Sequence, residues 1–223
     1  MRAQRWQTGG VVRKWTAVVP VKRLDAAKTR LRGAVPADRH PELALAMVRD
    51  TVTAVLGSAV VAELVVVTDD PAVTAAVREL GARVSPDPGG GLNAAMRYGA
   101  DEVAGLSAYR VVLAGDLPAL RPEQLDDALG RVTGRSFVPD ATGIGTVLLA
   151  VPPRVDLDPR FGGHSAAAHA ASGASALSGD WPGLRQDVDT AADLGTVLTL
   201  GAGRRTCGLL RDLGLTAECA PAA

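Results

Sequence analysis

Cysteine is nearly absent from the sequence, and neither sign of charge is in excess. Of 223 residues only Cys207 and Cys219 are cysteines. A chain of this size that is rich in valine and leucine does not depend on a disulfide framework, so the cytoplasm is the expected location. The 24 basic residues are balanced by 24 acidic ones. Because nucleic-acid and anionic-membrane surfaces need an excess of lysine and arginine, we expect neither as a partner.

Aromatic residues are also scarce, at 3% of the chain, although 47% of the residues are hydrophobic. A core of valine, leucine and alanine is typical of buried parallel strands covered by alanine-rich helices, which favours the α/β class. The length fits one domain. We expect a leader at 1–13, a single domain at 14–215 and a tail at 216–223. The leader is polar and has no apolar stretch long enough for a signal peptide or a membrane span.

Apolar runs of strand length recur along the chain, and turn residues followed by a helical pattern come after most of them. This alternation predicts βαβ units and a mainly parallel sheet. The six predicted strands are 16–20, 64–68, 82–85, 109–114, 136–138 and 147–151. In a doubly wound sheet the ligand lies beyond the carboxyl ends of the strands, so the chemistry is expected in the loops that follow them.

Several helix starts are marked in the sequence. Proline follows Asp70 and Arg121 where a helix should begin, and Asp70 is predicted to cap its helix rather than to bind a ligand. Between 41 and 55 the apolar residues recur mostly at three- and four-residue steps, with Arg49 and Asp50 between them. This spacing predicts a helix that faces the core.

The loop after the first predicted strand is the most basic part of the chain. Residues 20–32 contain five lysines and arginines in an otherwise neutral protein. Lys22, Lys28 and Arg30 could each neutralise an oxygen of a triphosphate. The alternative is a solvated basic turn. The loop lacks the glycine spacing of a phosphate-binding P-loop or a dinucleotide fingerprint, which argues against a dehydrogenase.

Asp116 follows the strand at 109–114 and is the best candidate for a metal ligand. A carboxylate at the carboxyl end of a strand offers the oxygen that Mg²⁺ prefers, and Mg²⁺ usually takes only one or two protein carboxylates. The alternative is an aspartate that bonds to its own backbone in a turn.

A second group of acidic residues lies near the C-terminus and supplies candidates for another metal ligand. Asp189 and Asp193 flank Thr190 in a pattern that resembles a capped helix start, so either carboxylate has a structural alternative. Asp187 precedes this pattern and is freer to bind a metal.

The glycine-rich turn at 86–95 is a candidate nucleotide-binding segment. Gly91 and Leu92 lie where the backbone can approach a flat ligand closely, and Asn93 offers a donor and an acceptor to the edge of a base. The alternative is a flexible turn ahead of a helix.

Two further segments are typical of small-anion sites. The hydroxyls of Thr146 and Ser165 and the backbone amide of Gly162 suit a phosphate or a carboxylate, with Ser165 as a plain helix cap as the alternative. His164 has no neighbouring serine or cysteine with a nucleophile signature, and His40 and His169 fall within or beside helical stretches, so we expect neither a catalytic triad nor a zinc site.

Taken together, these motifs resemble the phospholactate and phosphoenolpyruvate guanylyltransferases of coenzyme F420 biosynthesis, over about residues 15–200. The resemblance rests on six motifs in the same order: 17–22 with 28–31, 67–69, 91–95, 115–118, 161–165 and 187–190. It implies a three-layer α/β/α nucleotidyltransferase fold of Rossmann-like type with a mainly parallel central sheet. It also implies transfer of GMP from GTP to phosphoenolpyruvate or 2-phospholactate, with release of pyrophosphate.

The same resemblance implies a role for each candidate residue. Asp116, Lys22 and Lys28 are the expected catalytic residues. The implied binding sets are Thr146, Gly162 and Ser165 for the three-carbon phospho-acid, Asp116 and Asp187 for Mg²⁺, and Lys22, Lys28 and Arg30 for the triphosphate. His164 stands where a variable residue is expected, so Gly163 is a reserve candidate for the acceptor.

Several alternatives stay open from the sequence. The acceptor could be another phosphorylated compound, such as a phosphoglycerate, a sugar phosphate or a molybdenum-cofactor precursor. A nucleotide-binding domain without catalysis is the competitor from another class, and a glycosyltransferase ranks third because the chain has Gly115-Asp116 in place of an Asp-x-Asp. Formation of a homodimer and hand-over of the unstable product to the next enzyme of the pathway are also open.

Overall fold

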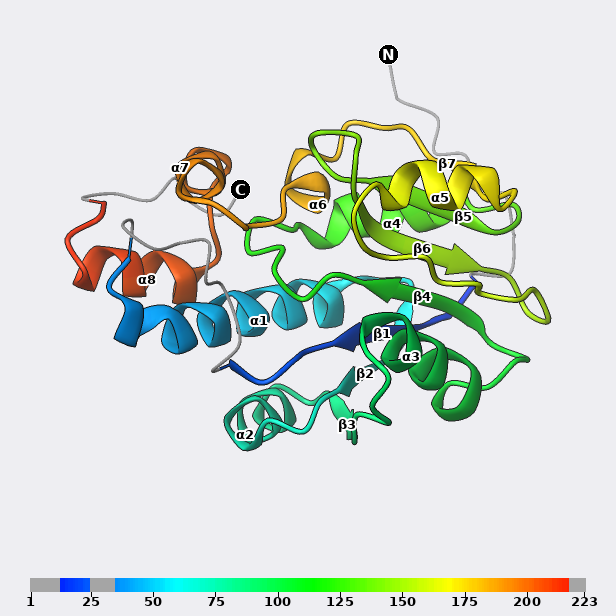
Figure 1. The fold of residues 1–223 in the computed structure, drawn as a ribbon, viewed down its shortest axis with the longest axis horizontal. Helices are drawn as coiled ribbons and strands as arrows, with labels where there is room; N and C mark the ends of the chain where they lie inside the picture. The colour runs from blue at the N-terminus through cyan, green and yellow to red at the C-terminus, as the bar shows by residue number, and fades with distance from the viewer. Residues whose placement is uncertain (1–12, 25–34, 217–223) are drawn as a thin grey trace, which may run out of the picture.

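A seven-stranded sheet runs through the centre of the molecule (Figure 1). The computed structural model describes residues 13–24 and 35–216. The strand order is β3-β2-β1-β4-β6-β5-β7, and only β6 is antiparallel to its neighbours β4 and β5. The strands are β1 Trp15–Pro20, β2 Val61–Val67, β3 Arg83–Ser85, β4 Tyr109–Leu113, β5 Ser136–Pro139, β6 Thr146–Val151 and β7 Ser175–Ala176.

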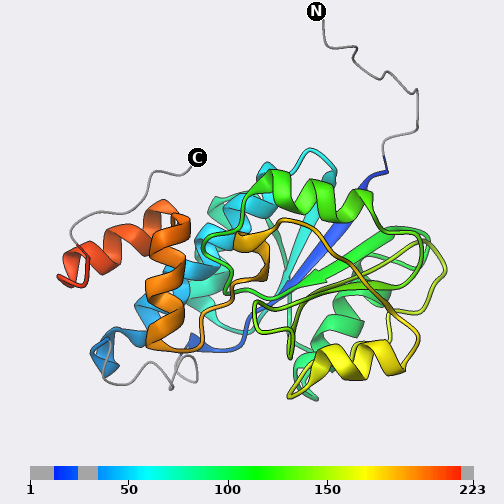
Figure 2. The ribbon, with the colours of Figure 1, turned by 90° about the horizontal axis from the view of Figure 1, so that it is seen from above.

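Helices cover both faces of the sheet. The helices are α1 His40–Gly57, α2 Pro71–Glu79, α3 Leu92–Tyr98, α4 Pro122–Gly130, α5 Ser165–Ala171, α6 Pro182–Arg185, α7 Ala191–Leu200 and α8 Arg204–Asp212. A short 3-10 turn at Ala37–Arg39 precedes α1, and a π-helical segment at Gly99–Val103 extends α3. Figure 2 shows the strands between α1 and α4 on one side and α3 and α5 on the other.

The alternation of side chains along β1 explains these layers. Ala17 and Val19 pack into one apolar cluster with residues of α1, α2 and α4, whereas Val18 packs into a second cluster with residues of α3 and α5. Successive side chains of a strand point to opposite faces, so a strand that is apolar throughout needs a covering layer on each side. The three-layer α/β/α fold expected from the resemblance is confirmed by this arrangement.

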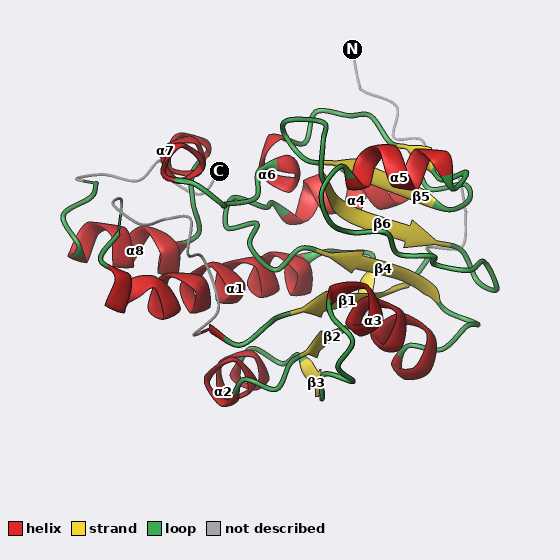
Figure 3. Cartoon of the chain, viewed as in Figure 1, coloured by secondary structure: helices red, strands yellow, loops and turns green. Residues whose placement is uncertain are grey.

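The C-terminal helices lie beyond the end of the sheet, at the left of Figure 3. A third apolar cluster joins α7 and α8 to the first half of α1, through side chains such as Leu43, Met47, Val197 and Leu210. In the N-terminal half of α1, Leu43 and Met47 are therefore buried by helices, whereas Ala44 and Val48 belong to the cluster that includes the strands.

The predicted elements agree with the structure, which adds the strand β7 and the helices α6 and α8 to them. The six predicted strands correspond to β1 to β6, and the predicted helix at 41–55 is α1. Asp70 caps α2 as predicted, since its side chain accepts hydrogen bonds from the backbone N–H groups of Ala72 and Val73. The two-residue strand β7 was not predicted, because it is exposed and too short to show an apolar pattern. No helix in the described part of the chain is long and apolar enough to cross a membrane.

Candidate active site

A cavity of about 830 Å³ lies beyond the carboxyl ends of β1 and β4. The ends of these two strands form its floor, and α1 and α3 contribute apolar walls. The segments 140–146 and 161–165 line it together with Asp187 and Asp189. A cavity at this edge of the sheet is the expected ligand site of a doubly wound fold.

Four aspartates from three segments of the chain line this cavity. They are Asp116, Asp140, Asp187 and Asp189. Burial raises the pKa of Asp187 to about 7, and the negative charges of Asp116, Asp189 and Asp140 contribute in the same direction. Negative charge is therefore concentrated around Asp187.

The donor set fits Mg²⁺ better than a metal that needs a complete protein cage. Within residues 13–24 and 35–216, no three or more acidic, histidine or cysteine side chains are grouped as a ready-made metal site. Mg²⁺ binds through one or two carboxylates and completes its octahedron with water and substrate phosphates. Asp116 and Asp187 are placed to act as such a pair, because both line the cavity and their charges interact.

Asp193 has a structural role, which separates it from Asp187 and Asp189. Its Oδ2 accepts hydrogen bonds from the backbone N–H groups of Asp189 and Thr190, at 3.1 and 2.7 Å. Thr190 is the N-cap of α7 and completes a capping box with Asp193. The capping alternative thus applies to Asp193, whereas the side chain of Asp189 lies in the lining of the cavity.

The loop that carries Asp116 is held from α1. Thr51 is fully buried, and its Oγ1 accepts a hydrogen bond of 3.0 Å from the backbone N–H of Leu117. The same hydroxyl donates to the carbonyl of Met47 one turn earlier in α1. Sequence reasoning missed Thr51, because a threonine within an amphipathic helix gives no sign of a partner in a distant loop.

Asp140 organises the turn that leads into β6. Its Oδ1 accepts hydrogen bonds from the hydroxyl of Thr142 and the N–H of Ile144, and its Oδ2 accepts one from the N–H of Gly145. The turn then delivers Thr146 to the wall of the cavity. The sequence contains a signal for this turn, since an aspartate directly before small residues favours local bonds of this type.

The acceptor candidates Thr146, Gly162 and Ser165 all line the cavity. Thr146 and Ser165 are buried, with 8% and 2% of their surface exposed. The N-cap of α5 is His164, in a left-handed conformation with φ of 58°, and Ser165 is the first residue of the helix. The alternative of Ser165 as a plain N-cap is therefore wrong, and its hydroxyl is placed at the cavity. Gly162 has φ of 143°, which favours glycine.

Asn93 differs from the expectation for the nucleotide-binding turn. Its Oδ1 accepts a hydrogen bond of 2.7 Å from the N–H of Phe161, and its Nδ2 donates one of 3.0 Å to the carbonyl of the same residue. Asn93 thus fastens the 161–165 segment, and we correct its expected contact with the edge of a base. Gly91 precedes α3 with φ of 90°, and Leu92 lines the cavity.

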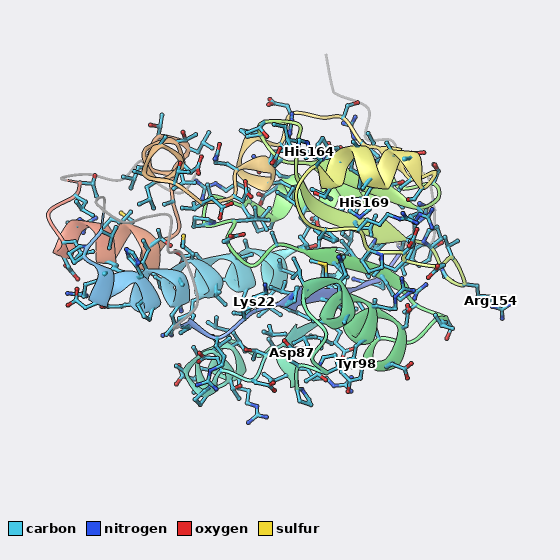
Figure 4. All side chains as sticks on the ribbon, viewed as in Figure 1. Lys22, Asp87, Tyr98, Arg154, His164 and His169 are labelled. Carbon is cyan, nitrogen blue, oxygen red and sulfur yellow. The ribbon has the colours of Figure 1, made fainter. Side chains whose placement is uncertain are left out.

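Lys22 is the described part of the expected triphosphate clamp. It lies two residues after the end of β1, is exposed and lines the cavity. Figure 4 shows Lys22 near the end of β1 and α1, with His164 and His169 on the segment that includes α5. Lys28 and Arg30 lie outside the described residues, so their roles stay predictions. The base of the loop is anchored at Leu24, whose N–H donates to Oδ2 of Asp70 at 2.9 Å.

Comparison with known proteins places this chain among guanylyltransferases. Residues 15–222 match the family described as Guanylyl transferase CofC like. A phosphoenolpyruvate guanylyltransferase from Salinispora arenicola is 59% identical over 202 residues, covering 87% of this chain and 94% of that protein. One from Geodermatophilus obscurus is 52% identical over 207 residues, covering 89% and 95%.

A solved structure shares the fold at low sequence identity. A nucleotide-diphospho-sugar transferase candidate from Desulfovibrio desulfuricans G20 superposes with a TM-score of 0.65 at 17% identity. The match covers 91% of this chain and 96% of that chain. It supports the nucleotidyltransferase-like architecture and nothing finer.

Proposed function

The chain belongs to the Guanylyl transferase CofC like family, and from this premise we propose that it transfers GMP from GTP to phosphoenolpyruvate. Two relatives named phosphoenolpyruvate guanylyltransferase are 59% and 52% identical to the chain over most of its length. The observation that carries the proposal in the structure is that one cavity brings together two kinds of residue. Asp116, Asp187 and Asp189 are called here its carboxylate side, and Thr146, Gly162 and Ser165 its donor side.

The carboxylate side is proposed to hold Mg²⁺ through Asp116 and Asp187. Repulsion from neighbouring aspartates contributes to the raised pKa of Asp187, and a divalent cation would counter this repulsion. When bound, Mg²⁺ would supply positive charge to the phosphates of GTP. Asp140 already accepts hydrogen bonds within its own turn, which makes it a poorer ligand than Asp116 and Asp187, and Asp189 is the alternative to Asp187.

The donor side is proposed to bind the acceptor through Thr146, Gly162 and Ser165. Hydroxyls and backbone N–H groups donate hydrogen bonds to phosphate and carboxylate oxygens, and phosphoenolpyruvate carries both groups. The two sides of the cavity would then keep the acceptor phosphate close to the α-phosphate of GTP.

The triphosphate is proposed to lie along the basic loop. Lys22 is at the rim of the cavity, and Lys28 and Arg30 are proposed to join it. The nucleoside would extend toward Gly91 and Leu92 at the start of α3. Asn93 would support the acceptor segment through Phe161.

The reaction needs no nucleophile from the protein. An oxygen of the acceptor phosphate attacks the α-phosphorus in line, a new bond forms between them, and the bond to the bridging oxygen of the β-phosphate breaks. That electron pair leaves with pyrophosphate, whose charge the basic loop stabilises. Alignment and charge stabilisation supply the catalysis.

The proposal is tested by incubating the protein with GTP, Mg²⁺ and one acceptor at a time, followed by mass detection of the product. We expect the guanylylated phosphoenolpyruvate and pyrophosphate, and no product in excess EDTA. A parallel reaction with 2-phospholactate tests the competing three-carbon acceptor, and reactions with phosphoglycerate and a sugar phosphate test the wider class.

Two variants sharpen this experiment. Asp116→Asn should abolish product formation, whereas Asp180→Asn, which removes an exposed carboxylate away from the cavity, should retain it. Absence of product with phosphoenolpyruvate from the unmodified protein would refute the proposed acceptor.

A further inference from the structure

His169 joins the two elements on the donor side of the cavity. It lies on α5 and is completely buried, with its ring packed near Phe137 and Phe161. Its Nδ1 is 3.0 Å from Oγ1 of Thr146 on β6. Its Nε2 is 2.9 Å from the backbone nitrogen of Arg160, next to the segment that carries Gly162. Figure 4 shows His169 within the covering helix, beside the sheet.

The contact with Arg160 determines which ring nitrogen carries the proton. A backbone N–H can only donate, so Nε2 must accept with its lone pair. A neutral imidazole with an accepting Nε2 has its hydrogen on Nδ1. Burial lowers the pKa of His169, and the charges of Arg135 and Arg160 lower it as well, against the charge of Asp158 and a hydrogen bond with the backbone of Ser165. The neutral ring with Nδ1–H is therefore the form at neutral pH.

This tautomer determines the direction of the bond to Thr146. Nδ1–H donates, so Oγ1 of Thr146 accepts, and the hydroxyl hydrogen must point elsewhere. In the part of the chain that the structure describes, this hydroxyl has no hydrogen bond other than the one to His169. Because Thr146 lines the cavity, its hydrogen is available to an oxygen of a bound ligand.

The second bond of the ring acts on the other acceptor-binding element. Arg160 is adjacent to Phe161, whose N–H and carbonyl are both bonded to Asn93. His169 and Asn93 therefore hold consecutive backbone groups of the segment that leads to Gly162. The same imidazole therefore fixes the orientation of the Thr146 hydroxyl and restrains the backbone that leads to Gly162.

We propose that His169 is a positioning residue that fixes the Thr146 hydroxyl as a hydrogen-bond donor to an anionic oxygen of the acceptor. This inference rests on the proposed function, since it assigns the acceptor to the donor side of the cavity. In this role His169 does not touch the substrate and acts through Thr146 and the backbone of residues 160–162.

Two substitutions separate the two bonds of the ring. In His169→Asn the shorter amide can place an N–H group near the position of Nδ1, which retains a donor to Thr146. In His169→Gln the longer amide can place an oxygen near the position of Nε2, which retains the acceptor for Arg160 and removes the donor. Both variants carry a neutral amide, so they are matched in polarity. A thermal unfolding measurement on each variant identifies one that fails to fold.

The decisive measurement is the KM for each substrate, with phosphoenolpyruvate and GTP varied separately. We expect His169→Gln to raise the KM for phosphoenolpyruvate by about tenfold or more, because a hydrogen bond to a charged group is weakened. The KM for GTP should change by less than about twofold on the same reasoning. Thr146→Val should produce a similar rise, and His169→Gln should add little in the Thr146→Val background, since both act through one hydroxyl.

Three results would overturn the inference while the unmodified protein makes product. These are equal rises in both KM values, additive effects in the double variant, or a better acceptor KM for His169→Gln than for His169→Asn. If the unmodified protein makes no product with any acceptor, the proposed function has failed instead. A nitrogen-15 NMR spectrum of the histidine ring then tests the tautomer without turnover: Nδ1–H supports the assignment, and Nε2–H or a doubly protonated ring at neutral pH refutes it.

Discussion

Replacing Asp187 with asparagine should stabilise the metal-free protein while it removes activity. In the folded chain, burial and the charges of Asp116, Asp189 and Asp140 raise the pKa of Asp187 from 3.8 to about 7. A difference of this size corresponds to at most about 4 kcal/mol. Because the side chain is half-buried and solvent screens part of the repulsion, we expect about 2 kcal/mol.

The pH dependence follows from the direction of the shift. The folded state holds the proton of Asp187 more tightly than the unfolded state, so the folded state loses relative stability as pH rises. This loss begins near the unfolded value of 3.8 and is complete above about 7. The asparagine side chain does not ionise, so the advantage of Asp187→Asn should grow across this window and then level off.

The assay is thermal unfolding in EDTA at several pH values between 5 and 8.5. For a chain of about 200 residues, 2 kcal/mol corresponds to roughly 4–8 °C in Tm. Asp193→Asn serves as a matched control, because it removes a capping carboxylate and should lower Tm instead. With Mg²⁺ and GTP present, the unmodified protein should have a higher Tm than Asp187→Asn, since only the unmodified protein gains the binding energy of the complex. An Asp187→Asn variant that is less stable than the unmodified protein at pH 8 in EDTA would refute this reasoning.

Substitutions at three other positions test how the site is supported. Asp116→Ala should reduce kcat by more than about a hundredfold with a change in Tm of at most a few degrees, and a large loss of thermal stability would count against a role in metal binding. Thr51→Val leaves the buried N–H of Leu117 without an acceptor, so we expect a loss of about 1–3 kcal/mol in chemical denaturation together with a lower kcat. An unchanged kcat would show that the loop holds its position without this bond. Asp50→Ala removes the acceptor for two backbone N–H groups of α8 and should cost about 1–3 kcal/mol, whereas Asp50→Asn should cost less.

The elements that were predicted correctly are those whose signal is local. The continuous valine and leucine runs of β2, β4 and β6 mark buried strands regardless of their partners. The N-cap at Asp70 depends on residues two and three positions away. The position of Asp116 follows from its place after a buried strand, because parallel strands bring their carboxyl ends to one edge.

The contacts that were missed join residues far apart in the sequence. Asp50 was expected among the polar positions of a core-facing helix, yet only 7% of it is exposed. Its carboxylate accepts hydrogen bonds from the N–H groups of Arg205 and Thr206, which are 155 and 156 positions away. His169 and Asn93 likewise reach residues 160 and 161 from other elements. No periodicity along the chain encodes such pairs, since they depend on how layers pack.

Neighbouring residues of α1 connect the C-terminal helices to the carboxylate side of the cavity. Asp50 holds the start of α8, and Thr51 holds the N–H of Leu117 beside Asp116. The N–H of Gly203, just before α8, donates to the carbonyl of Pro118 at 2.8 Å. A rigid helix cannot move one of these attachments without the other, so a displacement of α8 would shift the loop of Asp116. The helix α8 therefore supports the proposed metal site although none of its residues lines the cavity.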